Sequence, residues 1–247
     1  MLAVIRLIIL AVFFVVVGVL GCLFCILRPF HRNNTPLFAH IFGSMHRLFG
    51  LRLIIRKPED FDHQGPYVYI ANHQNSYDIF TMSRSLPLGT VTIGKKSLKW
   101  IPFFGQLYWL AGNILIDRKN KGRAYGTIGT AAEAIKKRKL SIWMFPEGTR
   151  NYGRGLLPFK TGAFHTALQA EVPVVPVCMS TTHNQVSLNR WRNGTVIIEF
   201  LPPIETAGLK KEGARELMQS AHAQMNAKIA QIDAEVASLD HDLTRKA

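Results

Sequence analysis

The sequence predicts an α/β protein in which a mostly parallel β-sheet is covered by helices on both faces and is preceded by a pair of hydrophobic, membrane-associating helices. Two observations lead to this prediction. The first is a run of 21 residues, Leu7–Leu27, that contains no charged side chain. The second is the alternation, after residue 60, of short apolar runs with segments of helical periodicity. We expect membrane-anchoring helices in residues 1–57 and one larger domain in residues 58–247, which ends in an amphipathic helix.

The apolar run has the properties of a retained membrane anchor. As a helix it would be about 32 Å long, close to the roughly 30 Å of a hydrocarbon core. Positive charges follow it at Arg28, Arg32, Arg47, Arg52, Arg56 and Lys57. By the positive-inside rule, they place the rest of the chain in the cytoplasm. A cleaved signal peptide fits less well because no A-x-A-like site follows, and Val19–Cys22 is only a weak lipoprotein cleavage box before a domain of cytoplasmic type.

A second apolar stripe at helical spacing follows the run. Its members are Phe38, Ile41, Phe42, Met45, Leu48 and Phe49. One interpretation is a helix that packs into the protein core. The other is an interfacial helix beside the first, so that both enter one leaflet. The sequence does not distinguish a transmembrane span from a re-entrant helix pair.

The charge of the chain points to a membrane partner. There are 30 lysine and arginine residues against 16 aspartate and glutamate residues, a net charge of +14. Basic proteins bind nucleic acid, anionic lipid or acidic partners. No signature of a nucleic-acid-binding module is present, so we expect no nucleic acid and favour membrane lipids. Three cysteines, two of them inside the apolar run, argue against a disulfide framework.

The sheet and its covering helices are expected after residue 60. The expected strands are Tyr67–Ala71, Thr90–Ile93, Ile114–Ile116, Ser141–Phe145, Val172–Cys178 and Thr195–Leu201. Helices are expected at Ala124–Lys139 and Gly162–Glu171. Continuous apolar strands that alternate with helices indicate a parallel sheet buried on both faces. A last helix carries an apolar stripe from Met218 to Leu239, which packs on the sheet or forms a dimer contact, so the oligomeric state is left open.

Polar side chains follow four of the expected strands at their carboxyl ends. They are Asn72-His73, Gly94–Lys96, Asp117-Arg118 and Pro146–Arg150. Ligands of parallel sheets gather at these ends of the strands. We therefore expect the four clusters to converge on one cleft.

His73 and Asp78 are the candidate catalytic pair. On one regular helix, residues five apart differ by about 140° of rotation, so the two would not be neighbours. They can meet only if His73 lies on a loop and Asp78 in the first turn of the next helix. In that arrangement Asp78 orients the imidazole, whose other nitrogen acts as a base on a hydroxyl. The alternative is that Asp78 caps a helix and His73 is an ordinary loop residue.

The segment Pro146–Arg150 is the candidate phosphate site. It follows a buried strand; its glycine allows close backbone approach and its arginine offers a planar fork for phosphate. Lys95 and Arg118 add positive charge at neighbouring strand ends. The alternative is a β-turn with a surface arginine.

Several other kinds of chemistry find no support. The sequence has no G-x-S-x-G elbow, no P-loop and no histidines at metal-binding spacing. Cys178 lies inside an apolar strand, and Ser76 lacks the strained turn that presents a nucleophile. We therefore favour direct attack by a substrate hydroxyl, with no metal and no cofactor.

Four segments, in order, resemble the sequence blocks of the glycerolipid acyltransferase family. They are Asn72-His73-x4-Asp78, Gly112-x4-Asp117-Arg118, Phe145–Arg150 and Val172–Val177. The resemblance covers roughly residues 50–205, together with the hydrophobic N-terminus. One departure is Leu115, where an aromatic residue is common in the family; it concerns packing rather than charge.

The resemblance implies a role for each site residue. His73 would be the general base, with Asp78 orienting it. The acceptor's phosphate would be held by Arg150, Gly148, Thr149, Arg118 and Lys95. Glu147 would position the glycerol backbone, and the Val172–Val177 strand would form a wall of the cleft and help to place the acyl thioester.

The resemblance also implies the reaction. An acyl group would pass from acyl-CoA or acyl carrier protein (acyl-ACP), as co-substrate, to the sn-2 hydroxyl of lysophosphatidic acid, forming phosphatidic acid. One alternative is acylation of glycerol 3-phosphate or of another lysolipid. A second is a lipid-binding protein without catalytic activity. The sequence leaves open the choice of donor and the preference for acyl chain length and saturation.

Overall fold

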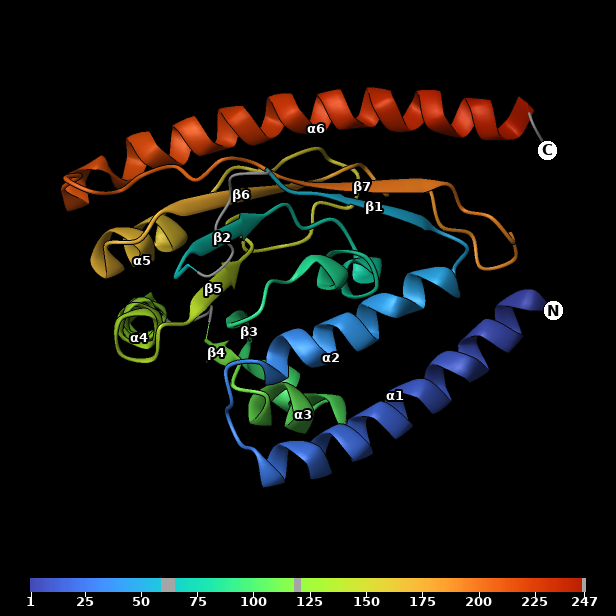
Figure 1. The fold of residues 1–247 in the computed structure, drawn as a ribbon, viewed down its shortest axis with the longest axis horizontal. Coiled ribbons are helices and arrows are strands. Elements are labelled where there is room, and N and C mark those ends of the chain that lie inside the picture. Colours follow the sequence, from blue (N-terminus) through green and yellow to red (C-terminus); the bar gives the residue numbers. More distant parts are fainter. Residues whose placement is uncertain (59–64, 118–120, 246–247) are drawn as a thin grey trace.

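The computed structural model describes residues 1–58, 65–117 and 121–245, which form a single sheet with helices on both of its faces (Figure 1). The strands are β1 (Arg52–Arg56), β2 (Val68–Ala71), β3 (Thr90–Lys95), β4 (Ile114–Ile116), β5 (Ser141–Met144), β6 (Val174–Met179) and β7 (Thr195–Phe200). The α-helices are α1 (Leu2–Leu27), α2 (Asn34–Gly43), α3 (Phe104–Leu110), α4 (Lys121–Arg138), α5 (Gly162–Ala170) and α6 (Ala214–Arg245). Short 3₁₀ helices are η1 (Ser44–Arg47), η2 (Ser76–Ile79), η3 (Met82–Ser85), η4 (Lys96–Trp100) and η5 (Lys211–Gly213).

The sheet confirms the predicted mostly parallel α/β fold. Its strand order is β1-β7-β6-β2-β5-β3-β4. The five strands from β6 to β4 are parallel to one another, and β7 runs antiparallel to β6. The carboxyl ends of β2, β3 and β5 therefore lie at one edge of the sheet, where we expected the site.

Strand β1 was not predicted from the sequence. It pairs in parallel with β7, from Arg52 opposite Thr195 to Arg56 opposite Glu199. Its two arginines, Arg52 and Arg56, were interpreted as charges that follow the apolar run. Because they occupy both ends of the strand, only three apolar residues lie between them, too few to show the alternation typical of a strand. Ile54 packs into the core on one face of the sheet and Leu53 into the core on the other. The strand thus belongs to the sheet although its residues fall within the expected N-terminal segment 1–57.

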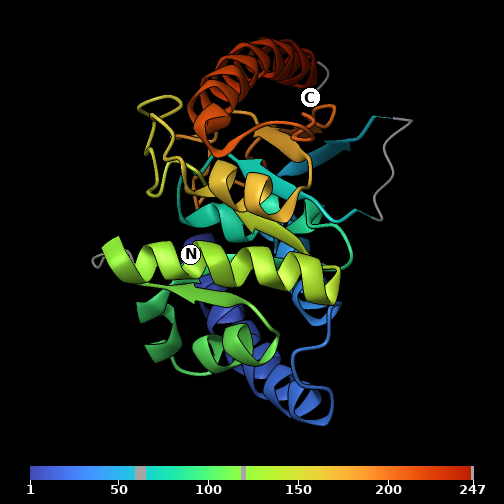
Figure 2. The same cartoon turned by 90° about the vertical axis from the view of Figure 1, so that its left-hand side faces the viewer.

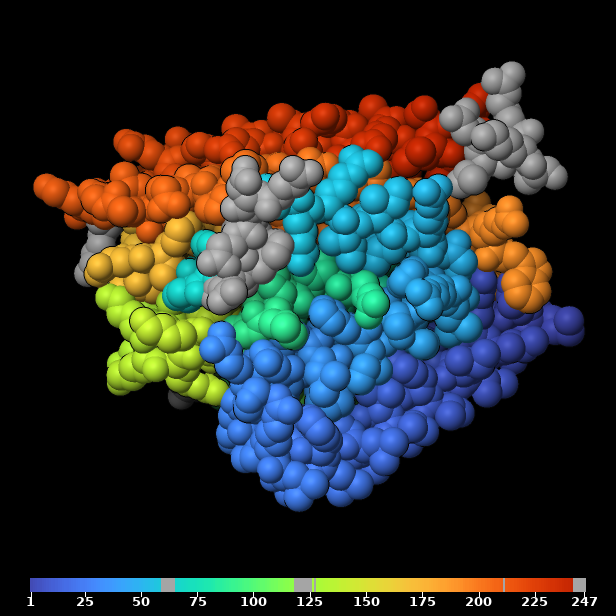
Figure 3. Space-filling view, viewed as in Figure 1, coloured from blue at the N-terminus to red at the C-terminus, as the bar shows by residue number. Residues whose placement is uncertain are grey.

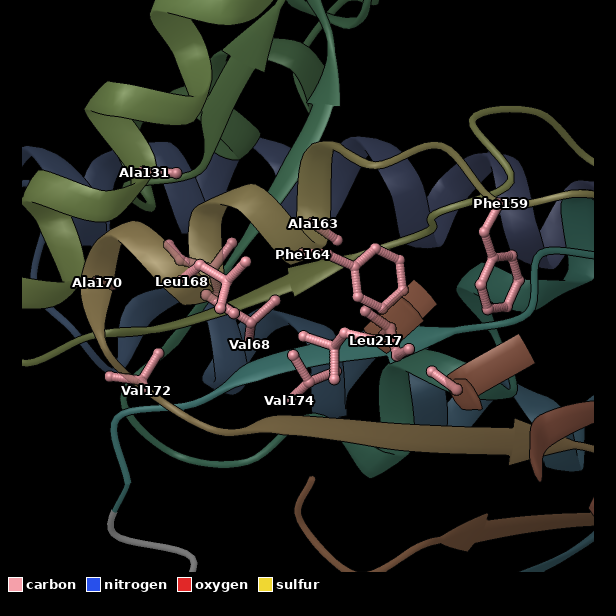
Figure 4. Close-up of a cluster of buried hydrophobic side chains, with 14 of the residues drawn as sticks. Val68, Ala131, Phe159, Ala163, Phe164, Leu168, Ala170, Val172, Val174 and Leu217 are labelled. Atoms are coloured by element: carbon pink, nitrogen blue, oxygen red, sulfur yellow. The ribbon is translucent and has the colours of Figure 1, made fainter. Parts of the chain in front are cut away.

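One face of the sheet is covered by α4, α5 and α6. Val68 of β2 and Val174 of β6 pack there against Phe164 and Leu168 of α5 (Figure 4). The apolar stripe of α6 adds Leu217, Ala221, Met225 and Ile232, all of them buried. This confirms the prediction that the C-terminal helix packs on the sheet.

The opposite face is covered by helices α1, α2 and α3 and by the short helices η1, η2 and η3. Tyr69 and Trp143, on neighbouring strands, stack with their ring centroids 5.6 Å apart. The predicted stripe in residues 38–49 packs into this interior, where Phe38, Phe42 and Phe49 are buried. Of the two interpretations of that stripe, the structure bears out the core helix. A membrane-associating helix pair is therefore not confirmed, since α2 is largely covered by protein.

Helix α1 lies on the far side of the molecule from α6 (Figures 1 and 2). Among the described residues, α1 is the one helix that is long enough and apolar enough to cross a membrane. Its most apolar 18-residue window has a mean hydropathy of 3.2. Only 11% of that window is buried. Its inner side packs closely on α2 and α3: a Cβ added to Gly21 would lie 2.8 Å from side-chain atoms of Leu107 and Phe38.

Close packing at Gly43 leads to a stability prediction. A Cβ at this position would lie 2.6 Å from the backbone nitrogen of Arg84, so Gly43→Ala must push α2 away from η3. We expect a loss of about 1–3 kcal/mol in the free energy of unfolding, and a Tm in detergent that is lower by several degrees. Gly126→Ala is the matched control. A Cβ there meets nothing within 4 Å on an exposed helix, so we expect an unchanged or higher Tm. Equal Tm values for the two variants would contradict this packing.

Candidate active site

A cavity of about 660 Å³ lies where β2, β3 and β5 end, between the sheet and helices α1, α2 and α3. Its polar end is lined by His73, Ser76, Asp78, Lys95, Thr149 and Arg150. Its apolar part is lined by residues that include Phe14, Phe38, Phe42, Ile79, Met82 and Leu107. Cations, a histidine–carboxylate pair and an apolar chamber thus share one space, which suits a substrate with a charged head and a hydrocarbon chain.

His73 and Asp78 form a hydrogen-bonded pair. The distance from His73 Nδ1 to Asp78 Oδ2 is 2.6 Å. His73 lies on the loop after β2, and Asp78 lies in η2, which confirms the predicted placement across a strand–helix turn. The same carboxylate accepts hydrogen bonds from the backbone N–H groups of Gln74 (2.7 Å) and Asn75 (3.3 Å). Because Asp78 engages Nδ1, the imidazole nitrogen that is left for a substrate proton is Nε2.

The imidazole ring is held in one plane. It stacks on Phe145, the residue after β5, with ring centroids 4.2 Å apart and an interplanar angle of 18°. The side chains of His73 and Asp78 are 19% and 5% exposed, so the pair meets the cavity mainly through the imidazole. This arrangement fixes the base by hydrogen bonding and by packing at the same time.

The loop that carries His73 is fastened to the end of β6. Asn72 exchanges two hydrogen bonds with the backbone of Met179, at 2.8 and 2.9 Å. The amide of Gln74 donates to the carbonyl of Ser180 (2.7 Å) and accepts from the N–H of Thr182 (2.7 Å). Gln74 and Thr182 were not predicted as site residues from the sequence. The uninterrupted polar run Asn72–Ser76 after a buried strand was the only signal for them.

Glu147 holds the backbone of the loop that carries His73. Its carboxylate accepts hydrogen bonds from the backbone N–H groups of His73 (2.6 Å) and Leu157 (2.9 Å). It is only 3% exposed, and burial raises its pKa, an effect opposed by these two hydrogen bonds. Glu147 does not line the cavity. This differs from the expectation that it contacts the glycerol backbone, because both oxygens are occupied by the protein's own amides.

Three of the five predicted phosphate residues, Arg150, Thr149 and Lys95, line the same cavity as the pair. Arg150 Nη1 donates to Ser76 Oγ at 3.0 Å, so the guanidinium lies beside the turn that contains Asp78. Thr149 and Lys95 line the same cavity and are exposed. Gly148 lies in the turn and not at the cavity wall; its φ of +71° is a conformation that residues with a side chain rarely adopt, which explains the glycine.

Comparison with known proteins assigns the chain to a family. An acyltransferase family model matches residues 52–180, more than half of the chain. The chain is 53% identical over 229 residues to the 1-acyl-sn-glycerol-3-phosphate acyltransferase of Escherichia coli, covering 93% of this chain and 94% of the relative. The chain belongs to the acyltransferase family.

Other relatives of this acyltransferase extend the comparison. The Haemophilus influenzae 1-acyl-sn-glycerol-3-phosphate acyltransferase is 47% identical, covering 93% of this chain and 95% of its own. The human 1-acyl-sn-glycerol-3-phosphate acyltransferase alpha is 35% identical over 84% of this chain and 74% of its own. The crystal structure of the 1-acyl-sn-glycerophosphate (LPA) acyltransferase PlsC from Thermotoga maritima shares the fold. Its TM-score is 0.71 at 21% identity, over 94% of this chain and 98% of the other.

Two expectations about the cleft of this acyltransferase are not borne out by the described residues. Arg118 is outside the described residues, and Asp117 lines a neighbouring cavity with Lys96 and Lys99. The proline-bracketed segment Val172–Val177 was expected to form a wall of the cleft. Instead its strand, β6, is buried between β2 and β7, and none of its described residues lines the cavity. It contributes indirectly, through the hydrogen bonds of Met179 to the His73 loop.

The cysteine of β6 is not available as a nucleophile in this acyltransferase. Cys178 is fully buried, and burial raises the pKa of its thiol to about 12. A thiolate at neutral pH is therefore disfavoured. This agrees with the preference, drawn from the sequence, for direct attack by a substrate hydroxyl.

The Glu147 contacts lead to a second prediction. Glu147→Gln would present an amide N–H₂ to one of two backbone N–H donors and leave that donor unsatisfied. We expect kcat to fall roughly 10- to 100-fold, since about 1–3 kcal/mol of support for the His73 loop is lost, while the KM for the acceptor changes little. Steady-state kinetics measures both constants. Glu205→Gln, at an exposed position, is the matched control and should leave both unchanged. A raised KM with normal kcat would instead mean that Glu147 binds the acceptor.

Proposed function

We propose that this acyltransferase transfers a fatty acyl group from acyl-CoA or acyl-ACP to the sn-2 hydroxyl of 1-acyl-sn-glycerol 3-phosphate (lysophosphatidic acid), which yields phosphatidic acid. The observation that carries the proposal is that the hydrogen-bonded His73–Asp78 pair lines one cavity together with Lys95, Arg150 and a set of apolar side chains. The names of the bacterial and mammalian relatives support the same acceptor.

The chemistry follows from the geometry of the pair. His73 Nε2 takes the proton of the glycerol hydroxyl while Asp78, on Nδ1, stabilises the imidazolium that forms. The hydroxyl oxygen attacks the thioester carbonyl and forms the new C–O bond. The C–S bond then breaks, and the thiolate takes the proton back from the imidazolium. No covalent bond to the protein is required, and no cofactor takes part besides the acyl donor itself.

The acceptor's phosphate would bind at the cationic end of the cavity. Arg150 offers a planar fork of donors, and Lys95 adds a point charge from the neighbouring strand. Thr149 and the turn at Gly148 shape this end of the cavity. Arg118 stays a candidate for the same group on the basis of the sequence alone.

A hydrocarbon chain would occupy the apolar part of the cavity. Phe14 of α1, Phe42 of α2 and Leu107 of α3 line it, so all three helices contribute to its wall. A volume of about 660 Å³ is in the range of sites that enclose a ligand of a few dozen atoms.

The reaction would take place at the cytoplasmic face of the inner membrane. Both the acceptor and the product are membrane lipids, and α1 brings a large apolar surface next to the cavity. The net charge of +14 favours an anionic surface and an acidic or phosphate-bearing donor. Nucleic acid plays no part in this proposal.

A panel of acceptors tests the proposal. Purified enzyme would be given acyl-CoA or acyl-ACP together with lysophosphatidate, glycerol 3-phosphate, a neutral monoacylglycerol or no acceptor. Release of free thiol and formation of product are measured in parallel. We expect lysophosphatidate to give the highest kcat/KM. Preference for glycerol 3-phosphate would overturn the assignment of the acceptor, and thiol release that never depends on an acceptor would overturn acyl transfer.

A further inference from the structure

Tyr152 has a backbone conformation that tyrosine rarely adopts. Its φ is +49°, in the left-handed region. A Cβ atom raises the energy of this conformation, whereas glycine adopts it without that cost. Six of the described non-glycine residues have a positive φ, and among these six only Tyr152 lines the cavity that contains the His73–Asp78 pair. Strained backbone conformations are concentrated at functional sites, so a reason for this tyrosine is expected in the cavity.

The side chain of Tyr152 contributes little to the packing of the protein. It is 54% exposed, and within the described residues it belongs to none of the hydrophobic clusters. Its backbone, by contrast, is used: the N–H of Tyr152 donates to the carbonyl of Gln74 at 3.0 Å, next to the bond from the N–H of Asn151 to the carbonyl of His73 at 2.9 Å. Every residue except proline has such an N–H. These two bonds therefore explain the position of the turn but not the choice of tyrosine.

The phenol hydroxyl of Tyr152 contacts the predicted phosphate ligand, Arg150. Arg150 Nη1 donates to Tyr152 Oη at 3.4 Å and to Ser76 Oγ at 3.0 Å. The two hydroxyls come from different elements, the turn after β5 and the 3₁₀ helix η2. Because Nη1 carries two N–H groups, these two contacts occupy both of them.

The other edge of the guanidinium is left for a ligand. In the part of the chain that the structure describes, Nε and Nη2 of Arg150 have no hydrogen-bond partner. Together they present parallel N–H groups, the arrangement in which arginine binds two oxygens of one phosphate. Ser76 and Tyr152 thus determine which edge of Arg150 can face an anion.

The turn after β5 and the N-terminal helices form different walls of the cavity. Figure 3 shows α1 and α2, in blue, adjoining one another across the lower part of the molecule. These two helices contribute apolar side chains such as Phe14 and Phe42. The turn contributes Thr149, Arg150 and Tyr152, which supply two hydroxyl groups and the guanidinium. Tyr152 therefore belongs to the polar wall, where a charged group of a substrate would bind.

We infer that Tyr152 is a positioning residue that sets the preference of this acyltransferase for acceptors that carry a phosphate. Its hydroxyl, together with Ser76, holds Nη1 of Arg150, so that Nε and Nη2 bind the phosphate. Tyr152 acts on the acceptor through Arg150 and takes no part in proton transfer. The inference rests on the proposed function, in which lysophosphatidate is the acceptor.

Tyr152→Phe tests the role of the hydroxyl, since the variant keeps the ring. We expect the KM for lysophosphatidate to rise about 3- to 10-fold, the effect of one lost hydrogen bond, with kcat unchanged. The KM for a neutral monoacylglycerol should stay the same. Asn184→Gly is the matched control: Asn184 is exposed, has a φ of +58° and does not line the cavity, so both constants should be unchanged. A wild-type KM for lysophosphatidate in Tyr152→Phe would overturn the inference.

A double variant tests whether Tyr152 acts through Arg150. In the Arg150→Ala background, Tyr152→Phe should change the KM for lysophosphatidate by less than about twofold, because the group that the hydroxyl holds is absent. The same initial-rate assay of thiol release measures this. A rise as large as in the wild-type background would mean that the two residues act independently, and it would overturn the positioning role.

Thermal unfolding separates this role from a purely structural one. Tyr152→Gly removes the strain together with the side chain, whereas Tyr152→Ala keeps a Cβ in the left-handed conformation. We expect the glycine variant to have the higher Tm of the two, while both raise the KM for lysophosphatidate at least as much as Tyr152→Phe. A Tm lowered by several degrees in all three variants, with an unchanged KM, would overturn the inference.

The wild-type enzyme distinguishes a failure of this inference from a failure of the proposed function. If the wild type does not acylate lysophosphatidate, the proposed function is wrong, and the inference that rests on it is overturned as well. If the wild type acylates lysophosphatidate and Tyr152→Phe has the same KM, only the role of Tyr152 is overturned. We expect an active wild type and a raised KM in the variant.

Discussion

His73→Ala is expected to lower kcat by roughly 10²–10⁴-fold, because the variant has no base for the acceptor hydroxyl. The KM for lysophosphatidate should change much less, since Arg150 and Lys95 are still in place at the cationic end of the cavity. Initial rates of thiol release from acyl-CoA over a range of acceptor concentrations measure both constants. His165→Ala is the matched control: this histidine lies in α5, on the other face of the sheet, and its loss should leave both constants unchanged.

Asp78→Asn tests the second half of the pair. The variant keeps the shape of the side chain, but its amide can present N–H₂ to Nδ1 and favour the wrong tautomer of His73. We expect a large loss in kcat, approaching that of His73→Ala, when initial rates are measured in the same way. Near-normal kcat in either variant would contradict the assignment of His73 as general base.

Arg150→Ala is expected to raise the KM for lysophosphatidate by about 10- to 100-fold. The physical reason is the loss of charge-assisted hydrogen bonds to phosphate, each worth about 1.5–3 kcal/mol. For a neutral monoacylglycerol the same variant should show an almost unchanged KM, since there is no phosphate to hold. The comparison of the two acceptors separates loss of phosphate binding from general damage to the cavity.

Arg154→Ala serves as the matched control for Arg150. Arg154 donates to the carbonyl of Arg150 at 3.1 Å but does not line the cavity. Its replacement should leave the KM for both acceptors within about twofold, as is usual for surface charges. If Arg150→Ala raised KM equally for the charged and the neutral acceptor, Arg150 would not be the phosphate ligand.

The regular part of the fold was predictable because its strands are short, continuous apolar runs. Val174 and Val175 face opposite sides of the sheet and are both fully buried. A strand of this kind is apolar at every position, and such a run is recognisable in the sequence. Strand β1 escaped prediction because it lies at the edge of the sheet, where its terminal arginines stay partly exposed. The helical stripe at Phe38 and Phe42 was recognised, but its partner could not be known, since periodicity shows that a face is buried and not what buries it.

The candidate site also has a part that could be predicted from the sequence and a part that could not. The meeting of His73 and Asp78 could be placed across a strand–helix turn, because rotation along a regular helix excludes a contact between the two within one helix. The contacts of Glu147 could not be predicted. Its partners are backbone N–H groups, which every residue except proline has, so the sequence does not indicate which of them it binds. The hydrogen bonds between Gln74 and the residues after β6 join positions more than one hundred apart in the chain, a pairing that only the folded sheet creates.

The most direct test of the account follows the acyl group itself. Wild-type enzyme is incubated with lysophosphatidate and an acyl donor labelled in its acyl chain; thiol and phosphatidate are quantified, and the product is digested with a phospholipase that cleaves only the sn-2 ester. We predict equal amounts of thiol and phosphatidate, with the label released entirely from sn-2, and rates with His73→Ala that are lower by roughly 10²–10⁴-fold. Label at another position, or transfer at a near-normal rate without His73, would contradict this prediction.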